Sequence, residues 1–150
     1  MRLQSRPWYC GAAAVVNALR CYGVRVRERV VAKHGGVSKE HGIQEHGIKQ
    51  ALERLGYTWE EISERRYANA EGLLLAALRR GHPAIVLVEE GGHWVVATGL
   101  LGDRVTVFDS QTGAWNRREN GVHVLQAGPP LRRYWTACGG QRYGIVVKPA

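Results

Sequence analysis

Two residues of this sequence, a cysteine and a histidine far apart in the chain, have the types and local settings of a nucleophile and its base. Cys10 precedes Gly11 where a helical pattern begins. Helix N-termini present unpaired backbone N–H groups and a partial positive charge, which favours a thiolate. A nucleophilic thiol also needs a base within reach. The alternative is a buried and inert Cys10, since free cysteines commonly pack as small hydrophobic residues.

His93 is the first candidate for that base. It follows Gly91-Gly92 and opens the alternating segment HWVVATGLL, so a rigid strand is expected to hold the direction of its ring. His123, in the pattern VHV, is the second candidate. The remaining histidines lie in predicted loops or on exposed helical faces, where solvated side chains are expected: His34, His41, His46 and His82.

Two further residues could complete such a site. Asp109 ends the segment RVTVFD, which the turn signal Gly102-Asp103 predicts to run beside the His93 strand. An aspartate there could fix the tautomer of His93, or it could serve only as a turn former. Gln4 lies six residues before Cys10. Its side-chain amide could join the backbone N–H of Cys10 as a donor to an oxyanion.

The elements that must hold these residues divide the chain into two halves. Apolar spacings of three and four predict helices over residues 11–22, 26–34, 42–56 and 69–78, ended by glycines. Short branched runs then predict strands over 83–90, 93–101, 104–110, 121–126 and 143–149. Residues 127–142 have no clear pattern and are expected to form a loop. This order predicts an α+β fold in one domain over residues 1–150, with an N-terminal helical lobe packed on an antiparallel sheet.

Composition limits the partners and the compartment. The formal net charge of +8 permits an acidic partner. The basic pairs are scattered along the chain, however, so we expect a solvated basic surface and not nucleic-acid binding. These pairs are Arg65-Arg66, Arg79-Arg80, Arg117-Arg118 and Arg132-Arg133. Three cysteines cannot all pair, so at least one thiol should be free. No apolar run approaches the roughly 20 residues of a membrane helix, and no signal peptide is evident. We expect a soluble, cytoplasmic protein.

Three motifs occur here in a distinctive order: QSRPWYCGAAAVVNALRCYG, GHWVVATGL and VFDSQTG. In this order they resemble the papain-like cysteine peptidases of the double-glycine leader type, which process bacteriocins, and their peptidase-like relatives. The resemblance implies a papain-like fold, with Cys10 as nucleophile, His93 as general base and acid, Asp109 as orienting residue and Gln4 as oxyanion donor. It implies hydrolysis of an amide bond in a peptide or protein substrate, through an acyl-enzyme and without a metal or organic cofactor.

The chain departs from the family pattern at two positions without losing a catalytic atom. Tyr9 stands where the family often has aspartate, and Ser110 stands where proline is frequent. The residues next to the predicted catalytic groups are candidates to line the substrate cleft, although the tryptophans could equally pack in the core: Trp8, Tyr9, Gly11, Gly92 and Trp94.

Two other functions are compatible with the same motifs. The fold could carry out acyl transfer or cleave an isopeptide bond, because both reactions use the same thiol chemistry. Alternatively the site could be inactive and the domain a basic binding module, whose nucleic-acid binding would depend strongly on salt.

Overall fold

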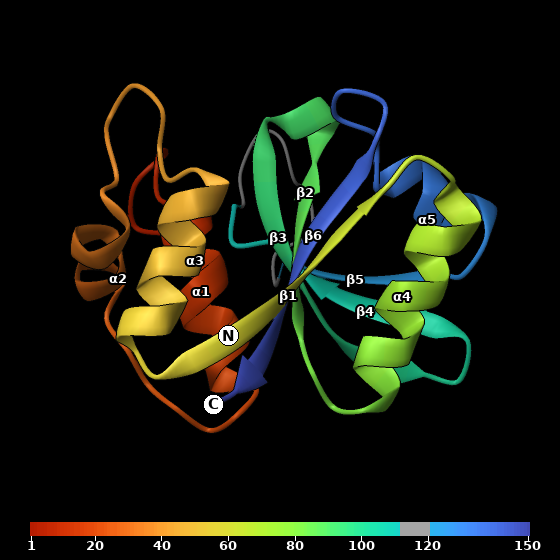
Figure 1. Cartoon of the computed structure of the whole chain (residues 1–150), viewed down its shortest axis with the longest axis horizontal. Coiled ribbons are helices and arrows are strands. Elements are labelled where there is room, and N and C mark those ends of the chain that lie inside the picture. Colours follow the sequence, from red (N-terminus) through yellow and green to blue (C-terminus); the bar gives the residue numbers. More distant parts are fainter. Residues whose placement is uncertain (112–120) are drawn as a thin grey trace.

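Residues 1–111 and 121–150 are described by the computed structural model, in which a six-stranded antiparallel sheet lies between two groups of helices (Figure 1). The strands are β1 Tyr57–Glu64, β2 Ala84–Val88, β3 His93–Leu101, β4 Arg104–Phe108, β5 Val122–Gln126 and β6 Arg142–Pro149. Their spatial order is β1-β6-β2-β3-β4-β5. The C-terminal strand β6 therefore lies between β1 and β2 and joins β1 to the rest of the sheet.

Alternation along the strands divides the core into two clusters, one on each face of the sheet. In β3, Trp94 and Val96 pack with the first cluster, whereas Val95 and Ala97 pack with the second. Successive strand residues point to opposite faces, so an apolar run such as that of β3 is expected where both faces are covered.

Three helices cover the first face: α1 Cys10–Arg20, α2 Glu28–Gly35 and α3 Glu45–Arg54. Ile43, 3% exposed, is the side chain at which they meet. A Cβ atom on Gly11 of α1 would lie 1.9 Å from Ile43 Cγ2, and one on Gly35 of α2 would lie 2.1 Å from Ile43 Cδ1. One on Gly47 of α3 would lie 2.9 Å from Ile43 Cγ1. The three glycines thus leave the space that Ile43 fills.

The second face is covered by α4 Tyr67–Arg79 and α5 Pro129–Tyr134 (Figure 1). Two prolines begin α5. Proline is tolerated there because N–H groups in the first turn of a helix have no intrahelical acceptor, so the missing N–H group costs no helical hydrogen bond. Trp135 directly follows α5 and is fully buried, with its indole Nε1 donating to the carbonyl oxygen of Tyr143 at 3.2 Å. The tryptophan therefore anchors the segment between α5 and β6.

The predicted α+β class, four helices and five strands are confirmed, with three differences. Residues 57–64 form β1, which no pattern predicted, and residues 129–134 form α5 within the predicted loop. The fourth helix packs with α5 on the second face and does not join the N-terminal helical lobe. The Arg117-Arg118 pair and the end of the predicted SQTG turn lie outside the described residues. No helix in the two described ranges combines the length and the apolar character needed to span a membrane.

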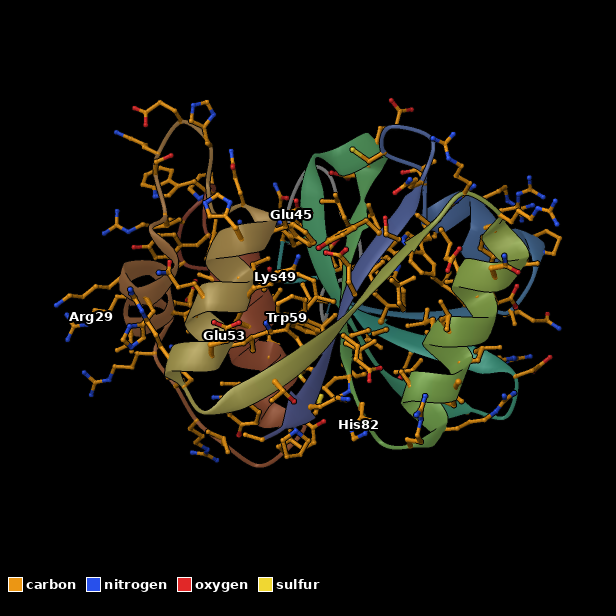
Figure 2. All side chains as sticks on the ribbon, viewed as in Figure 1. Arg29, Glu45, Lys49, Glu53, Trp59 and His82 are labelled. Atoms are coloured by element: carbon orange, nitrogen blue, oxygen red, sulfur yellow. The ribbon has the colours of Figure 1, made fainter. Side chains whose placement is uncertain are left out.

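Polar side chains hold β1 against α3. Figure 2 shows Glu45, Lys49 and Glu53 along α3, with Trp59 of β1 beside them. The ammonium of Lys49 lies 4.5 Å from the centre of the Trp59 ring, and the Trp59 Nε1 donates to Glu53 Oε1 at 3.0 Å. Lys49 also pairs with Glu61 of β1. These contacts explain why a strand with mostly polar residues still has a defined place in the fold.

Candidate active site

Cys10 is the first residue of α1, at the N-terminal end of the helix. The preceding Tyr9 has a non-helical backbone, with φ −101° and ψ 16°, and its carbonyl accepts the first helical bond from Ala13 at 2.8 Å. Backbone N–H groups in the first turn of a helix have no intrahelical acceptor. The Cys10 thiol is therefore next to a partial positive charge, as the sequence predicted.

The ring of His93 lies between Asp109 and Cys10. Its Nε2 is 2.7 Å from Asp109 Oδ1, and the Cys10 side chain is close enough to the ring to raise the pKa of His93. Because Asp109 occupies Nε2, Nδ1 is the ring nitrogen left for the thiol. His93 is 3% exposed, so water has little access to its contacts with Asp109 and Cys10.

Two opposing effects act on the pKa of His93. Burial is the largest single effect and lowers the pKa, because it disfavours the charged ring. The hydrogen bonds from Asp109 and Cys10, together with their negative charges, outweigh burial and raise the pKa to about 10. The surroundings of the ring therefore stabilise the imidazolium, which is the form that pairs with a thiolate.

Asp109 directly follows β4, and both its main chain and its side chain form hydrogen bonds there. Its backbone N–H donates to the carbonyl of Gly121 at 2.8 Å, which extends the pairing of β4 toward β5. Its Oδ1 accepts from the backbone N–H of Gln111 at 2.9 Å and also faces His93. The Asp109 carboxylate is thus held by the turn with one oxygen next to the His93 ring.

The turn before His93 has an unusual backbone. Glu89 and Glu90 have φ values of 53° and 54°, and Gly91 has a φ of 96°. Left-handed conformations are costly for residues with side chains, and they persist only where neighbours hold them. Here the Glu90 N–H donates to Thr136 Oγ1 at 2.8 Å. A Cβ on Gly91 would lie 2.6 Å from the sulfur of Cys138, so the segment after α5 packs closely on this turn.

Gln4 lies near the site with its carboxamide already engaged. Its Nε2 donates to the carbonyls of Arg6 and Pro7 at 2.9 and 3.1 Å, and its Oε1 accepts from Ser110 Oγ at 2.9 Å. Gln4 borders a hollow of about 280 Å³ together with Ser110, and this hollow is distinct from the cleft that Cys10 borders. Its role as an oxyanion donor stays a prediction.

A cleft of about 630 Å³ opens beside Cys10. Trp8, Gly92 and Trp94 line it, as expected from their places in the sequence. Trp94 is 7% exposed and donates from Nε1 to the Ile43 carbonyl at 3.2 Å, so its wall of the cleft is fixed. The other two candidates lie behind the cleft surface, because Tyr9 packs against the core and Gly11 is buried.

The cleft has one wall that the sequence did not reveal. Residues 39–45, between α2 and the start of α3, line it from Lys39 to Glu45. The Lys39 ammonium lies 5.4 Å from the centre of the Trp8 ring, and the Arg6 guanidinium lies 5.8 Å from it, so two cations flank this tryptophan. Residues 39–41 have no periodic pattern, and the helix predicted over 42–56 begins only at Glu45, so residues 42–44 belong to the loop. Neither pattern indicates a position beside a distant cysteine.

The second histidine candidate has other surroundings. His123 lies in β5, and its ring packs against that of Tyr134 in α5 with the centroids 5.3 Å apart. Cys10, Cys21 and Cys138 are all free thiols. Within residues 1–111 and 121–150, no group of three or more histidine, cysteine, aspartate or glutamate side chains could hold a metal ion.

The whole architecture matches that of known peptidase domains. The peptidase domain of Streptococcus ComA, a bi-functional ABC transporter involved in quorum sensing, has a TM-score of 0.70 and 19% identity, with 99% of this chain and 97% of that chain covered. A double glycine motif protease from an AMS/PCAT transporter, solved with the leader peptide, has a TM-score of 0.71 and 20% identity, covering 99% and 89%. The Streptococcus mutans ComA peptidase domain has a TM-score of 0.63 and 19% identity, covering 99% and 98%. None of the curated proteins has a significantly similar sequence.

At these identities the structural matches establish the fold, which is that of the C39 peptidase domains and is papain-like. The sequence profile described as "Peptidase_C39 like family" matches residues 2–143. The chain belongs to the Peptidase_C39-like family. This confirms the resemblance and the fold class inferred from the three motifs.

Proposed function

We propose that the chain is a cysteine peptidase, with residues 1–150 as one peptidase domain and with Cys10, His93 and Asp109 as its catalytic triad. The main support is the position of the His93 ring, whose Nε2 lies 2.7 Å from Asp109 Oδ1 and whose pKa is raised by both Asp109 and Cys10. A nucleophile bonded to a base that is itself oriented by a third group is the arrangement used for acyl transfer to a side chain. Membership of the family supports the same reaction.

In the first half of the reaction, the Cys10 thiolate forms a bond to the carbonyl carbon of the scissile amide. The carbonyl π electrons move to the oxygen, which becomes an oxyanion. When this intermediate collapses, the C–N bond breaks and the leaving nitrogen takes the proton of His93. The products are a free amine and a thioester on Cys10.

In the second half, neutral His93 removes a proton from water, and the resulting hydroxide equivalent attacks the thioester. Asp109 keeps a proton on Nε2, so that Nδ1 acts as the base toward the cleft. Breaking of the C–S bond releases the carboxylic acid product and restores the thiolate. No metal or organic cofactor takes part in these steps.

The oxyanion needs donors that are in place before it forms. The Cys10 backbone N–H is one, since it lies at the first position of α1 and has no intrahelical acceptor. Gln4 is the second. Its amide nitrogen carries two hydrogens, and the neighbouring carbonyls of Arg6 and Pro7 can share one of them and leave the other for the substrate.

The substrate is proposed to be a peptide or protein segment that crosses the cleft. The cleft is open to solvent and lined by both aromatic and polar side chains, which suits an extended chain better than a small apolar molecule. The related double glycine motif protease, solved with the leader peptide, makes a double glycine the first cleavage position to test.

The test begins with iodoacetamide labelling between pH 4 and 9, with each modified cysteine identified by mass spectrometry. Cys10 should react rapidly well below the ~8.5 typical of a free thiol. His93→Ala should remove this reactivity, while Cys21 and Cys138 serve as internal controls. Equal reactivity of all three cysteines would contradict the proposed triad.

Peptides that carry Gly-Gly, Ala-Ala or Val-Val at one position are then incubated with wild type and Cys10→Ala. Cleavage by wild type alone supports the peptidase. If products form only with an added amine, the reaction is acyl transfer. Nucleic-acid binding that falls with salt and is unchanged in Cys10→Ala, without any turnover, would instead indicate a binding module.

A further inference from the structure

Residues 2–5, called here the N-terminal strap, are tied to α1 by a buried asparagine. Asn17 of α1 is 0% exposed. Its Oδ1 accepts from the Arg2 backbone N–H at 2.8 Å, and its Nδ2 donates to the Arg2 carbonyl at 2.9 Å. The carboxamide therefore binds both main-chain groups of one strap residue, much as a neighbouring strand would. A buried amide with no other partner among the described contacts indicates that this pairing is its role.

The strap has a second anchor at the end of β4. The Gln4 backbone N–H donates to the Ser110 carbonyl at 3.0 Å, and Ser110 Oγ donates to Gln4 Oε1 at 2.9 Å. Ser110 is 4% exposed, and Asn17, His93 and Ser110 are the buried polar residues of the described ranges. A third contact, from the Ser5 N–H to Glu28 Oε2 at 3.1 Å, lies at the surface.

These two anchors connect Gln4 with both ends of the triad. Asn17 lies on the same helix as Cys10, so a rigid helical segment sets the distance between the strap and the nucleophile. Ser110 directly follows Asp109, the residue that orients His93. The carbonyls of Arg6 and Pro7 can only accept, so they hold Nε2 on their side and leave Oε1 toward Ser110, whose hydroxyl donates to it.

Resting on the proposed function, we propose that Asn17 and Ser110 are positioning residues that hold Gln4 for its role at the oxyanion. Neither touches the substrate. Asn17 fixes the strap to the helix of the nucleophile, and Ser110 holds the Oε1 end of the Gln4 amide next to Asp109. The geometry of the oxyanion donor is thereby coupled to the geometry of the triad.

Two variants test the proposal without altering the Cys10–His93 contact. Asn17→Leu keeps the size of the side chain and removes both bonds to Arg2, and Ser110→Ala removes the single bond to Gln4 Oε1. On the peptide that wild type cleaves best, each should lower kcat by about 10- to 100-fold with KM changed by less than about 2-fold, since misplacing a catalytic group affects the transition state. Labelling of Cys10 by iodoacetamide should keep its wild-type rate.

The decisive comparison is made in a Gln4→Ala background. If both residues act through Gln4, neither variant should lower kcat further there. If Asn17 and Ser110 had only structural roles, each variant would lower kcat in the Gln4→Ala background by the same factor as in wild type. Tyr67→Phe is the matched control, because it removes one hydrogen bond to the Gly128 carbonyl on the other face of the sheet and should leave kcat unchanged. Full additivity with Gln4→Ala would overturn the proposal.

Hydrogen exchange separates this proposal from the peptidase itself. The Gln4 backbone amide should exchange slowly in wild type, and its protection should fall in Asn17→Leu and not in Tyr67→Phe. If the Gln4 amide is protected from exchange but no peptide is cleaved, the two anchors of the strap are supported and the proposed peptidase activity is rejected. Unchanged Gln4 protection in Asn17→Leu would reject the anchors even in an active enzyme.

Discussion

Gly11→Ala is the substitution whose consequence can be worked out most directly from the structure. The new Cβ would lie 1.9 Å from Ile43 Cγ2 and 3.3 Å from Trp94 Cδ1. Carbon atoms in contact prefer a separation of about 3.5–4.0 Å, so the two groups must separate by roughly 1.5–2 Å. Ile43 is β-branched and buried, which restricts its rotation. The strain therefore falls on the backbone at the start of α1, next to Cys10.

The magnitude follows from comparable changes in packed cores. Inserting a methyl group there typically costs about 1–3 kcal/mol. Alanine is favoured over glycine in a helix by up to about 1 kcal/mol, so any measured loss of stability in Gly11→Ala is a minimum estimate of the steric cost. A shift of about 1 Å at Cys10 should slow its alkylation by iodoacetamide by on the order of 100-fold, because the contact with His93 is lost.

The assay is urea unfolding of four proteins: wild type, Gly11→Ala, Ile43→Ala and the double variant. Ile43→Ala alone should cost about 2–5 kcal/mol, since it empties the space between three glycines. The double variant should be more stable than the sum of the single changes predicts, by at least about 1 kcal/mol, because the clashing methyl is gone. Additive losses, or a Gly11→Ala protein with wild-type stability and labelling rate, would refute this description of the packing around Ile43.

Three other changes test separate parts of the structure. Asp109→Asn should lower the pKa of His93 from about 10, since the carboxylate favours the imidazolium; NMR titration of the ring nitrogens measures this, and an unchanged pKa would count against the contact. Trp135→Ala should cost about 3–5 kcal/mol in urea unfolding, because the indole is fully buried, and a loss below about 1 kcal/mol would contradict its anchoring role. Gly91→Ala should lower the free energy of unfolding, because Gly91 has a positive φ and the new Cβ would lie 2.6 Å from the sulfur of Cys138. Adding Cys138→Ala should restore only the part of the stability that the clash removed. If the double variant regained wild-type stability, the backbone at Gly91 would carry no strain.

The residues of the candidate site were predictable because each lies at the end of an element with a strong local signal. Cys10 begins a helix whose apolar residues repeat every three or four positions, and His93 is the first residue of a strand rich in valine. The turn signal at Gly102-Asp103 already predicted that Asp109 lies beside the His93 strand. The approach of Cys10 to His93 depended on the family resemblance, since local patterns carry no information on which distant segments come together.

The two elements that the sequence did not predict, β1 and α5, have weak or ambiguous local patterns. In β1, Ile62 is the buried residue, and the neighbouring Glu60 and Glu61 break the alternation that marks a half-buried strand. The strand is defined by its pairing with β6 and by contacts to α3, which only the folded chain supplies. The α5 segment begins with two prolines, which suggested a loop although they are also tolerated in the first turn of a helix.

The position of β6 also affects when a nascent chain can complete its fold. Tyr143 of β6 and Glu61 of β1 are hydrogen-bonded although they are 82 residues apart, and β6 also pairs with β2, which leads into the turn before His93. A ribosome will have made Cys10, His93 and Asp109 well before it makes β6, the strand that joins β1 to the rest of the sheet. Pairing between distant segments is also slow compared with helix formation. The sheet that carries His93 and Asp109 can therefore be completed only at the end of synthesis, after every residue of the candidate site has been made.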